Sequence, residues 1–311
     1  MLWIALAAGL VLLVAGGEAL VRGASALASR LGVSPLLVGL TVVGFGTSTP
    51  ELVTSLQAAL SGSPGIAFGN VIGSNTANIL LILGLAALLS PFAVERRAFL
   101  RDGPALALAT LACLGVVLWG ALSRPAGAVL VVGLILYLLY AYRSERGLSA
   151  AEAAPEQPAM RLSIAALWAV GGIALTVLGA RLLVDASITL AALWGVPDEV
   201  IGLTVVAIGT SLPELVTTVV AALRRQGEIA FGNVVGSNLY NILGILGITA
   251  LVRPIPVPPQ IAALDIWVML AATVALVAVC VSGWRATRGE GAVLLAAYGL
   301  YIGWLALGSL A

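Results

Sequence analysis

Two glutamates stand inside long apolar runs and are the clearest candidates for chemistry. Glu51 ends the motif GTSTPE, which begins at Gly46, and Glu214 ends GTSLPE, which begins at Gly209. An ionised carboxylate in the middle of a membrane helix costs at least ~2.5–3.5 kcal/mol, so each glutamate needs a positive partner. No arginine lies near the middle of an apolar run. The sequence therefore favours a bound cation or a proton as that partner.

A second polar motif follows each glutamate, GNVIGSN in the first half and GNVVGSN in the second. Asn78 and Asn241 lie four residues after Ser74 and Ser237, so each Ser/Asn pair shares one helix face. The Gly and Pro of the glutamate motifs interrupt a helix and free backbone carbonyls. Carboxylates, carboxamides, hydroxyls and carbonyls together suit Ca²⁺, which takes about 6–8 oxygen ligands, and can regroup around Na⁺.

Simpler roles exist for the same groups. The two carboxyls could stay protonated and link helices by hydrogen bonds, although the duplication of the whole motif would then be unexplained. Asn78 and Asn241 could serve only as hydrogen-bond partners between helices. We assign the remaining asparagines of the motifs mainly to packing or backbone hydrogen bonding: Asn70, Asn75, Asn233 and Asn238.

Composition excludes a soluble protein. Of the 311 residues, 61% are hydrophobic and 9% are charged, against about 25% charged residues in soluble domains. The formal net charge of +1 indicates no nucleic-acid partner. The chain has no histidine, and Cys113 and Cys280 lie in separate apolar runs, so a zinc site or a histidine relay lacks its ligands.

The sequence predicts neither an enzyme nor a bound cofactor. An intramembrane hydrolase would need Ser48 or Ser211 as its nucleophile, but no His or Lys exists to activate either. A purely structural membrane scaffold would leave two buried carboxylates in matched motifs unexplained.

Apolar runs of the ~20 residues that cross a bilayer recur along the whole chain. The first run has no basic segment before it, so we expect a retained helix and not a cleaved signal peptide. We predict ten membrane helices, near residues 3–28, 34–60, 65–89, 103–121, 125–142, 162–189, 197–223, 228–250, 262–283 and 291–309.

An internal repeat relates the two halves. A shift of 163 residues aligns 39–84 with 202–247 without a gap and gives 31 identities in 46 positions. The repeat covers about five helices, and because five is odd the second copy enters the membrane from the opposite side. We therefore predict an all-α integral membrane protein with helices 2 and 7 broken at a central ion site. Two inverted five-helix repeats, 1–142 and 162–311, are joined by a cytoplasmic linker, 143–161.

The arginines indicate the orientation, because cytoplasmic loops carry an excess of basic residues. With the N-terminus outside, only Arg124 and Arg253 fall in external loops. We therefore expect a multi-pass protein of the cell (inner) membrane with both termini outside. The cytoplasmic set is Arg30, Arg96, Arg97, Arg101, Arg143, Arg146, Arg161, Arg224, Arg225, Arg285 and Arg288.

The paired motifs, GTSTPELVTS with GNVIGSNTANIL and GTSLPELVTT with GNVVGSNLYNIL, resemble the alpha-repeats of the calcium:cation antiporter superfamily, especially prokaryotic sodium/calcium exchangers. The resemblance covers nearly the whole chain and implies ten helices with a central site on the second, third, seventh and eighth. The side-chain ligands that it implies are Glu51, Thr47, Ser48, Ser74 and Asn78, with Glu214, Thr210, Ser211, Ser237 and Asn241. Backbone carbonyls of Gly44, Thr47, Ala207 and Thr210 would complete the shell.

The resemblance implies a secondary antiporter, functional as a monomer, that exchanges Ca²⁺ for Na⁺ by alternating access. Some relatives carry Asp at the position of Asn241, and Asn here leaves two site carboxylates, which balance one Ca²⁺ but not three Na⁺. The cation/proton branch adds a second pair of acidic residues after its Gly-Asn motif, whereas 71–75 and 234–238 contain none. Proton/calcium exchange on the same scaffold is the alternative, and participation of K⁺ is open.

Charged pairs also stand inside the first and sixth helices. The 163-residue shift matches Glu18 with Arg181 and Arg22 with Asp185. The spacing of four residues predicts a local pair on each helix. An alternative is that Glu18 meets Arg181 across the repeats.

Overall fold

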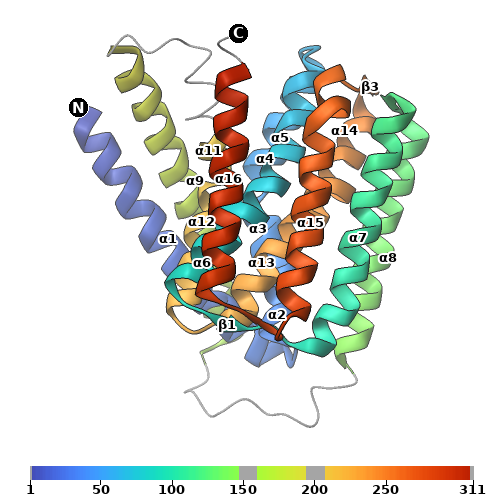
Figure 1. Ribbon diagram of the computed structural model, residues 1–311. Coiled ribbons are helices and arrows are strands. Elements are labelled where there is room, and N and C mark those ends of the chain that lie inside the picture. The colour runs from blue at the N-terminus through green and yellow to red at the C-terminus, as the bar shows by residue number, and fades with distance from the viewer. Residues whose placement is uncertain (1, 147–159, 194–206, 309–311) are drawn as a thin grey trace.

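The computed structural model describes residues 2–146, 160–193 and 207–308, and nearly all of them are helical (Figure 1). The first half contains helices α1 (Leu2–Leu31), α2 (Pro35–Val38), α3 (Gly44–Thr47), α4 (Thr49–Leu60), α5 (Pro64–Ala77), α6 (Gly84–Leu89), α7 (Arg96–Trp119) and α8 (Arg124–Arg146). The second half contains α9 (Leu162–Leu193), α11 (Ala207–Thr210), α12 (Leu212–Leu223), α13 (Gly227–Leu239), α14 (Gly247–Val252), α15 (Ile266–Val281) and α16 (Arg288–Gly308).

In the described ranges, four π-helical segments interrupt these helices: η1 (Gly39–Val43), η2 (Asn78–Leu83), η4 (Tyr240–Leu246) and η5 (Ile261–Asp265). The sequence analysis did not anticipate them. Segments η2 and η4 occupy matching places in the two halves, and each contains one of the two asparagines proposed as ligands. Because π-helical turns are frequent at functional sites, their positions draw attention to Asn78 and Asn241.

Within the three described stretches, seven helices are long and apolar enough to cross a membrane, and a bent pair makes an eighth candidate. The bent pair is Pro35–Thr47 with Thr49–Leu60, which meet at 44°. The predicted span 197–223 lies partly outside the described residues, and the span 291–309 corresponds to the 21-residue helix α16. The protein is thus an all-helical membrane protein. The seven spans are Leu2–Leu31, Pro64–Leu89, Arg96–Trp119, Arg124–Ser144, Leu162–Leu190, Gly227–Val252 and Ile261–Val281.

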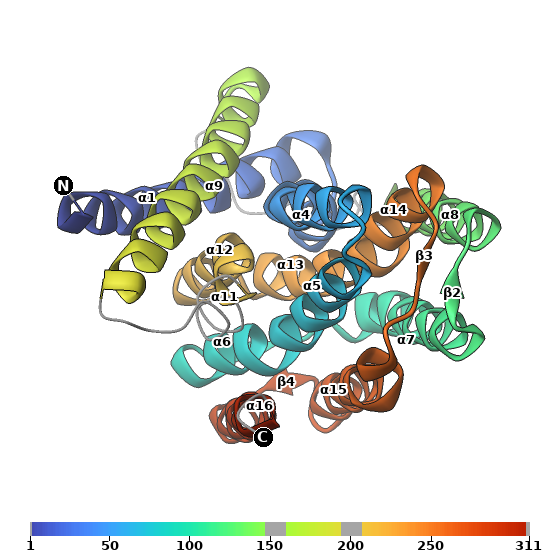
Figure 2. The same ribbon diagram turned by 90° about the horizontal axis from the view of Figure 1, so that it is seen from above.

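Two spans form the centre of the molecule. The most apolar windows of Pro64–Leu89 and Gly227–Val252 are 78% and 83% buried, against 28–44% for the other five. Seen from above, α5 and α13 lie in the middle of the bundle, with α7, α8, α15 and α16 toward one side (Figure 2). Since both central spans carry a GNVxGSN motif, the polar residues lie where protein, and not lipid, surrounds them.

Helices α1 and α9 pack closely along small residues (Figure 2). A Cβ added to Gly16 would lie 2.6 Å from the backbone N of Thr176, and one added to Gly23 would lie 2.4 Å from that of Ala169. The partner number falls as the α1 number rises, so the two helices run antiparallel. Such close approach through glycines is typical of packed membrane helices.

Helix α7 begins seven residues earlier than predicted, at Arg96. The charges of its first turns are accommodated locally, because Arg101 Nε lies 2.6 Å from Asp102 Oδ1 and Tyr137 Oη donates to the same oxygen at 3.0 Å. The charged residues before the apolar run therefore belong to the helix and do not mark its beginning.

Two short antiparallel strand pairs, also not predicted, join loops of opposite halves. Strand β1 (Phe92–Ala93) pairs with β4 (Arg285–Ala286), and β2 (Ala121–Leu122) pairs with β3 (Ile255–Pro256). The register places Phe92 opposite Ala286 and Leu122 opposite Ile255. These pairings tie the two halves together outside the helices.

Candidate functional site

Each glutamate follows a break between two helices. Ser48 separates α3 from α4 with φ −82° and ψ 9°, and Ser211 precedes α12 with φ −90° and ψ 9°. Pro50 and Pro213 lie in the first turn of the following helix, where the missing N–H leaves a carbonyl of the preceding turn without its helical donor. Each break thus leaves a backbone carbonyl without its helical donor, a few residues before a glutamate.

The two breaks are cross-linked by reciprocal hydrogen bonds. Ser48 Oγ donates to Glu214 Oε1 at 2.8 Å, and Ser211 Oγ donates to Glu51 Oε1 at 3.2 Å. Both carboxylates are buried, with at most 1% of the residue exposed. Residues 163 apart in the sequence therefore make the same contact in opposite directions.

Asn70 and Asn233 support this arrangement from the neighbouring central helices. Asn70 Nδ2 donates to the backbone O of Glu51 at 3.0 Å, and Asn233 Nδ2 donates to that of Glu214 at 3.3 Å. Their Oδ1 atoms accept from threonines of the opposite half, Asn70 from Thr210 at 3.5 Å and Asn233 from Thr47 at 3.2 Å. The sequence analysis assigned both asparagines mainly to packing or backbone hydrogen bonding, and it missed the link to the opposite half.

The remaining expected residues are distributed around this core. Ser211 Oγ also lies 3.2 Å from Ser74 Oγ, and Ser237 Oγ donates to the backbone O of Gly44 at 3.3 Å. Asn78 Nδ2 donates to Asn238 Oδ1 at 3.0 Å. Asn241 is fully buried, but its side chain has no hydrogen-bond partner among the described residues.

One more expected ligand, Ala207, begins α11. No contact of its carbonyl is resolved, so its place in the site stays a prediction. Ten of the twelve expected residues thus make hydrogen bonds in the structure, although the side chain of Asn78 bonds only to Asn238, outside the expected set, and Ala207 and Asn241 are placed by their helices alone.

Unpartnered acceptors mark the chemistry of the site. In the described stretches, nine buried side-chain atoms lack a hydrogen-bond partner, and five of them belong to Glu51, Glu214, Asn78 and Asn241. They include Oε2 of both glutamates and Oδ1 of both asparagines. An unsatisfied buried polar group costs about 1–3 kcal/mol, more when charged. Each of these four buried oxygens is an acceptor without a donor, and a cation is one kind of partner that could satisfy it.

The protein supplies no counter-charge to the glutamates in the part of the chain that the structure describes. The ion pairs seen there include Arg22–Glu18, Arg224–Glu18 and Arg101–Asp102, and none involves Glu51 or Glu214. No group of three His, Cys, Asp or Glu side chains occurs in the same residues. A metal ion at Glu51 and Glu214 would therefore be completed by neutral oxygens.

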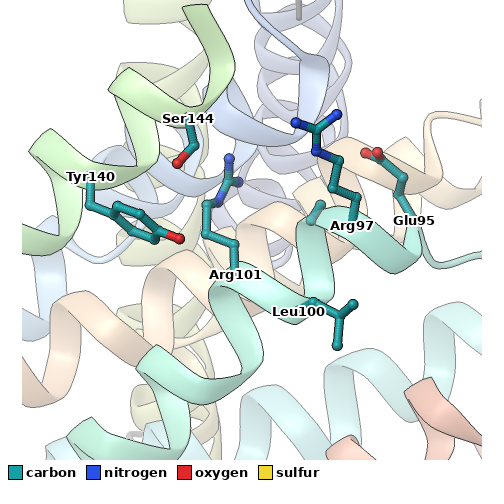
Figure 3. Close-up of a pocket in the computed structure, with 7 residues that line it drawn as sticks. Glu95, Arg97, Leu100, Arg101, Tyr140 and Ser144 are labelled. Atoms are coloured by element: carbon teal, nitrogen blue, oxygen red, sulfur yellow. The ribbon is translucent and has the colours of Figure 1, made fainter. Parts of the chain in front are cut away.

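A surface pocket of about 290 Å³ lies elsewhere, between the beginning of α7 and the end of α8 (Figure 3). Arg97 and Arg101 extend from α7 toward the α8 side, where Tyr140 and Ser144 lie (Figure 3). Glu95 also lines it, and Arg101 is paired with Asp102. Counting Asp102, the pocket thus has two arginines and two carboxylates around it. None of its lining residues is among the expected ligands.

Comparisons with known proteins agree with this geometry. The sodium/calcium exchanger protein family matches residues 1–143 and 164–307. The inner membrane protein YrbG of Escherichia coli is 38% identical over 313 residues, which are 96% of this chain and 94% of the relative. The sodium/calcium exchanger MaX1 of Methanosarcina acetivorans is 35% identical over 343 residues, covering 93% and 94% of the two chains.

A solved structure is similar over the same extent. The sodium-calcium exchanger NCX_Mj, soaked with 2.5 mM Na⁺ and 0.1 mM Ca²⁺, superimposes with a TM-score of 0.84 at 32% identity and covers 96% of each chain. Family, relatives and structure all match from one end of the chain to the other. The chain therefore belongs to the sodium/calcium exchanger protein family, as a prokaryotic member of the calcium:cation antiporter superfamily.

Proposed function

We propose that this membrane antiporter exchanges Ca²⁺ for Na⁺ at one central site, which opens alternately to the two sides of the membrane. The observation that carries the proposal is the set of buried acceptors without donors: Oε2 of Glu51 and Glu214 and Oδ1 of Asn78 and Asn241. The hydroxyls of Thr47, Ser48, Ser74, Thr210, Ser211 and Ser237, with the carbonyls of Gly44, Thr47, Ala207 and Thr210, are proposed to supply the other oxygens.

The chemistry of this set favours a hard cation. Ca²⁺ takes about 6–8 oxygen ligands in flexible geometry, whereas Mg²⁺ keeps several waters. Two carboxylates neutralise one Ca²⁺ and fall one charge short of three Na⁺. Because both ions would use the same carboxylates, binding of one excludes the other, which is the requirement for exchange.

We propose the architecture of ten helices in two inverted repeats, 1–142 and 162–311, for the mechanism. The matched helices α1 and α9 run antiparallel, which a two-fold axis in the membrane plane produces and an axis along the membrane normal does not. Thr110 Oγ1 lies 3.3 Å from Thr273 Oγ1, its counterpart 163 residues on. A residue that contacts its own counterpart lies on the two-fold axis.

Sodium is proposed as the coupling ion in preference to the proton. The second motifs hold no acidic residue between 71 and 75 or between 234 and 238. A proton-coupled exchanger on this scaffold would have to rely on Glu51 and Glu214 alone, which are already needed for Ca²⁺.

We also propose an orientation with both ends of the chain outside the cell membrane. Helix α1 begins and α16 ends at the same end of the molecule (Figure 1). The arginine distribution of the sequence assigns that end to the external side, which makes 143–161 a cytoplasmic linker.

Flux in proteoliposomes tests the proposal. Vesicles loaded with Na⁺ and diluted into Na⁺-free buffer with calcium-45 should take up calcium, and an ionophore that collapses the Na⁺ gradient should stop the uptake. A pH gradient without Na⁺ should drive none. Uptake driven by the pH gradient alone would replace sodium coupling with proton coupling, and no uptake under either gradient would refute exchange.

A further inference from the structure

One hydrogen bond between the halves involves a residue outside the proposed ligand set. Asn78, the first residue of η2, donates from Nδ2 to Oδ1 of Asn238 in α13 at 3.0 Å. Both residues are buried, at 1% and 0% exposure. The bond therefore joins a proposed ligand of one repeat to a side chain of the other inside the protein.

This bond fixes which way the Asn78 amide faces. Because its N–H₂ donates to Asn238, its carbonyl oxygen is directed elsewhere, and that Oδ1 has no donor among the described residues. A cation accepts only the oxygen end of a carboxamide. A cation at Oδ1 also polarises the amide and strengthens the donation from Nδ2. The contact thus favours the orientation that cation binding needs.

The counterpart contact is open in the same structure. In the 163-residue repeat, Asn78 corresponds to Asn241 and Asn238 corresponds to Asn75. The segments η2 and α13, which carry the first pair, are in contact, and so are η4 and α5, which carry the second. Yet Asn241 Nδ2 and Asn75 Oδ1, a donor and an acceptor, are both buried without a partner in the described stretches. Asn75 Nδ2 donates to the backbone O of Val71 at 2.7 Å. One amide pair is closed while its counterpart, with complementary groups, is not.

We infer that Asn238 and Asn75 are positioning residues that orient the Asn78 and Asn241 amides toward the cation, and that the two pairs close alternately. In an inverted repeat, opening to the opposite side exchanges the surroundings of the two halves. In that state the Asn241–Asn75 hydrogen bond forms, and the hydrogen bond between Asn78 and Asn238 breaks. The inference rests on the proposed function, since it assigns a role within that cation site.

A double-mutant cycle tests the positioning role. Asn238→Ala should raise the Ca²⁺ concentration for half-maximal uptake about three- to tenfold with little change in maximal rate. In the Asn78→Ala background the same change should have less than a twofold effect, because no amide remains to be oriented. Asn238→Leu, which keeps the volume without the acceptor, should behave like Asn238→Ala if the alanine variant folds poorly.

The matched control is Asn75 with Asn78, whose side chains share no hydrogen bond: the bond between these residues runs from the backbone N–H of Asn78 to the backbone O of Asn75. Asn75→Ala combined with Asn78→Ala should multiply the two single effects, whereas Asn75→Ala combined with Asn241→Ala should not. Multiplicative effects for Asn78 with Asn238, or a loss of maximal rate instead of affinity, would show a packing role and overturn the inference. Wild-type uptake under the Na⁺ gradient is measured alongside, so failure of the exchange activity itself is recognised separately.

Alternation is tested by measuring the Ca²⁺ concentration that gives half-maximal uptake on each face of the protein. Right-side-out and inside-out vesicles give access to the two faces. Asn238→Ala removes the pair that is closed here and should lower apparent affinity on one face while raising it on the other, since apparent affinity follows the population of the competent state. Asn75→Ala should shift the ratio of the two affinities in the opposite direction. Shifts in the same direction for both variants would contradict alternate closing.

Discussion

Ser48 of the first repeat and Glu214 of the second are hydrogen-bonded across the centre of the protein, with 2.8 Å between Oγ and Oε1. Ser211 and Glu51 repeat the contact in the other direction at 3.2 Å. In each glutamate one oxygen is held by a serine and the other, Oε2, has no donor in the described part of the chain. The serines thus hold one oxygen of each carboxylate and leave the other without a donor.

Ser48→Ala should raise the Ca²⁺ concentration for half-maximal uptake by about tenfold. A hydrogen bond to a charged group contributes about 1.5–3 kcal/mol, and about 1.4 kcal/mol corresponds to a factor of ten. Calcium-45 uptake at graded Ca²⁺ measures it. Ser25→Ala is the control, because Ser25 Oγ donates only within its own helix, to the O of Val21 at 3.0 Å. Equal effects of the two variants would contradict the orienting role of Ser48.

Asn78→Ala and Asn241→Ala should each weaken Ca²⁺ binding while leaving exchange measurable. Each removes a neutral oxygen, which a water can replace at small cost. Isothermal titration of the purified variants with Ca²⁺ measures the affinity. If both variants bound Ca²⁺ like the wild type, the two asparagines would be hydrogen-bonding residues and not ligands.

Gly236→Ala should destabilise the protein, whereas Gly73→Ala should not. A Cβ at Gly236 would lie 2.3 Å from the backbone O of Leu40, while a Cβ at Gly73, its repeat counterpart, would meet nothing within 4 Å. Overpacking against backbone typically costs about 1–3 kcal/mol. Thermal unfolding in detergent compares the variants. Similar midpoints for both would mean that the central helices are not packed this closely.

Glu18 and Arg224 should be coupled by about 0.5–1 kcal/mol, the range for a partly exposed ion pair. The structure confirms the predicted Glu18–Arg22 pair at 2.6 Å and adds an ion pair with Arg224 at the end of α12. Glu18 thus links α1 to α12. In the described stretches Arg181 pairs with neither Glu18 nor Asp185, so the predicted local pair on α9 is not seen. A double-mutant cycle of Glu18→Gln and Arg224→Gln, scored by thermal unfolding, measures the coupling. Arg225→Gln is the control for lost charge, and purely additive effects would exclude the link.

The sequence could predict the helical membrane fold and could single out the residues of the candidate site, because both depend on local patterns. Apolar length gives the spans, and a polar motif duplicated at a fixed offset stands out in an apolar chain. Pro50 and Pro213 mark the helix breaks for the same local reason.

Other features depend on packing between distant segments. Whether Asn238 meets Asn78 or Asn75 meets Asn241 depends on how two central helices cross, and the 163-residue repeat makes both contacts equally plausible. The π-helical segments and the strand pairs likewise have no local signature in residues 78–83 or 92–93. The early beginning of α7 was missed because the pair that neutralises Arg101 is formed with its direct neighbour Asp102. A pair between adjacent residues gives no sign of a helix, whereas a pair spaced by three or four residues would have done so.

The most direct test of the account is calcium-45 uptake by Glu51→Gln and Glu214→Gln in Na⁺-loaded proteoliposomes. Each change keeps the shape of the side chain and removes one of the two charges that balance the ion, so both variants should insert and fold but lose Na⁺-driven Ca²⁺ uptake. Uptake by either variant at a rate comparable to the wild type would contradict the assignment of the two glutamates as the cation site.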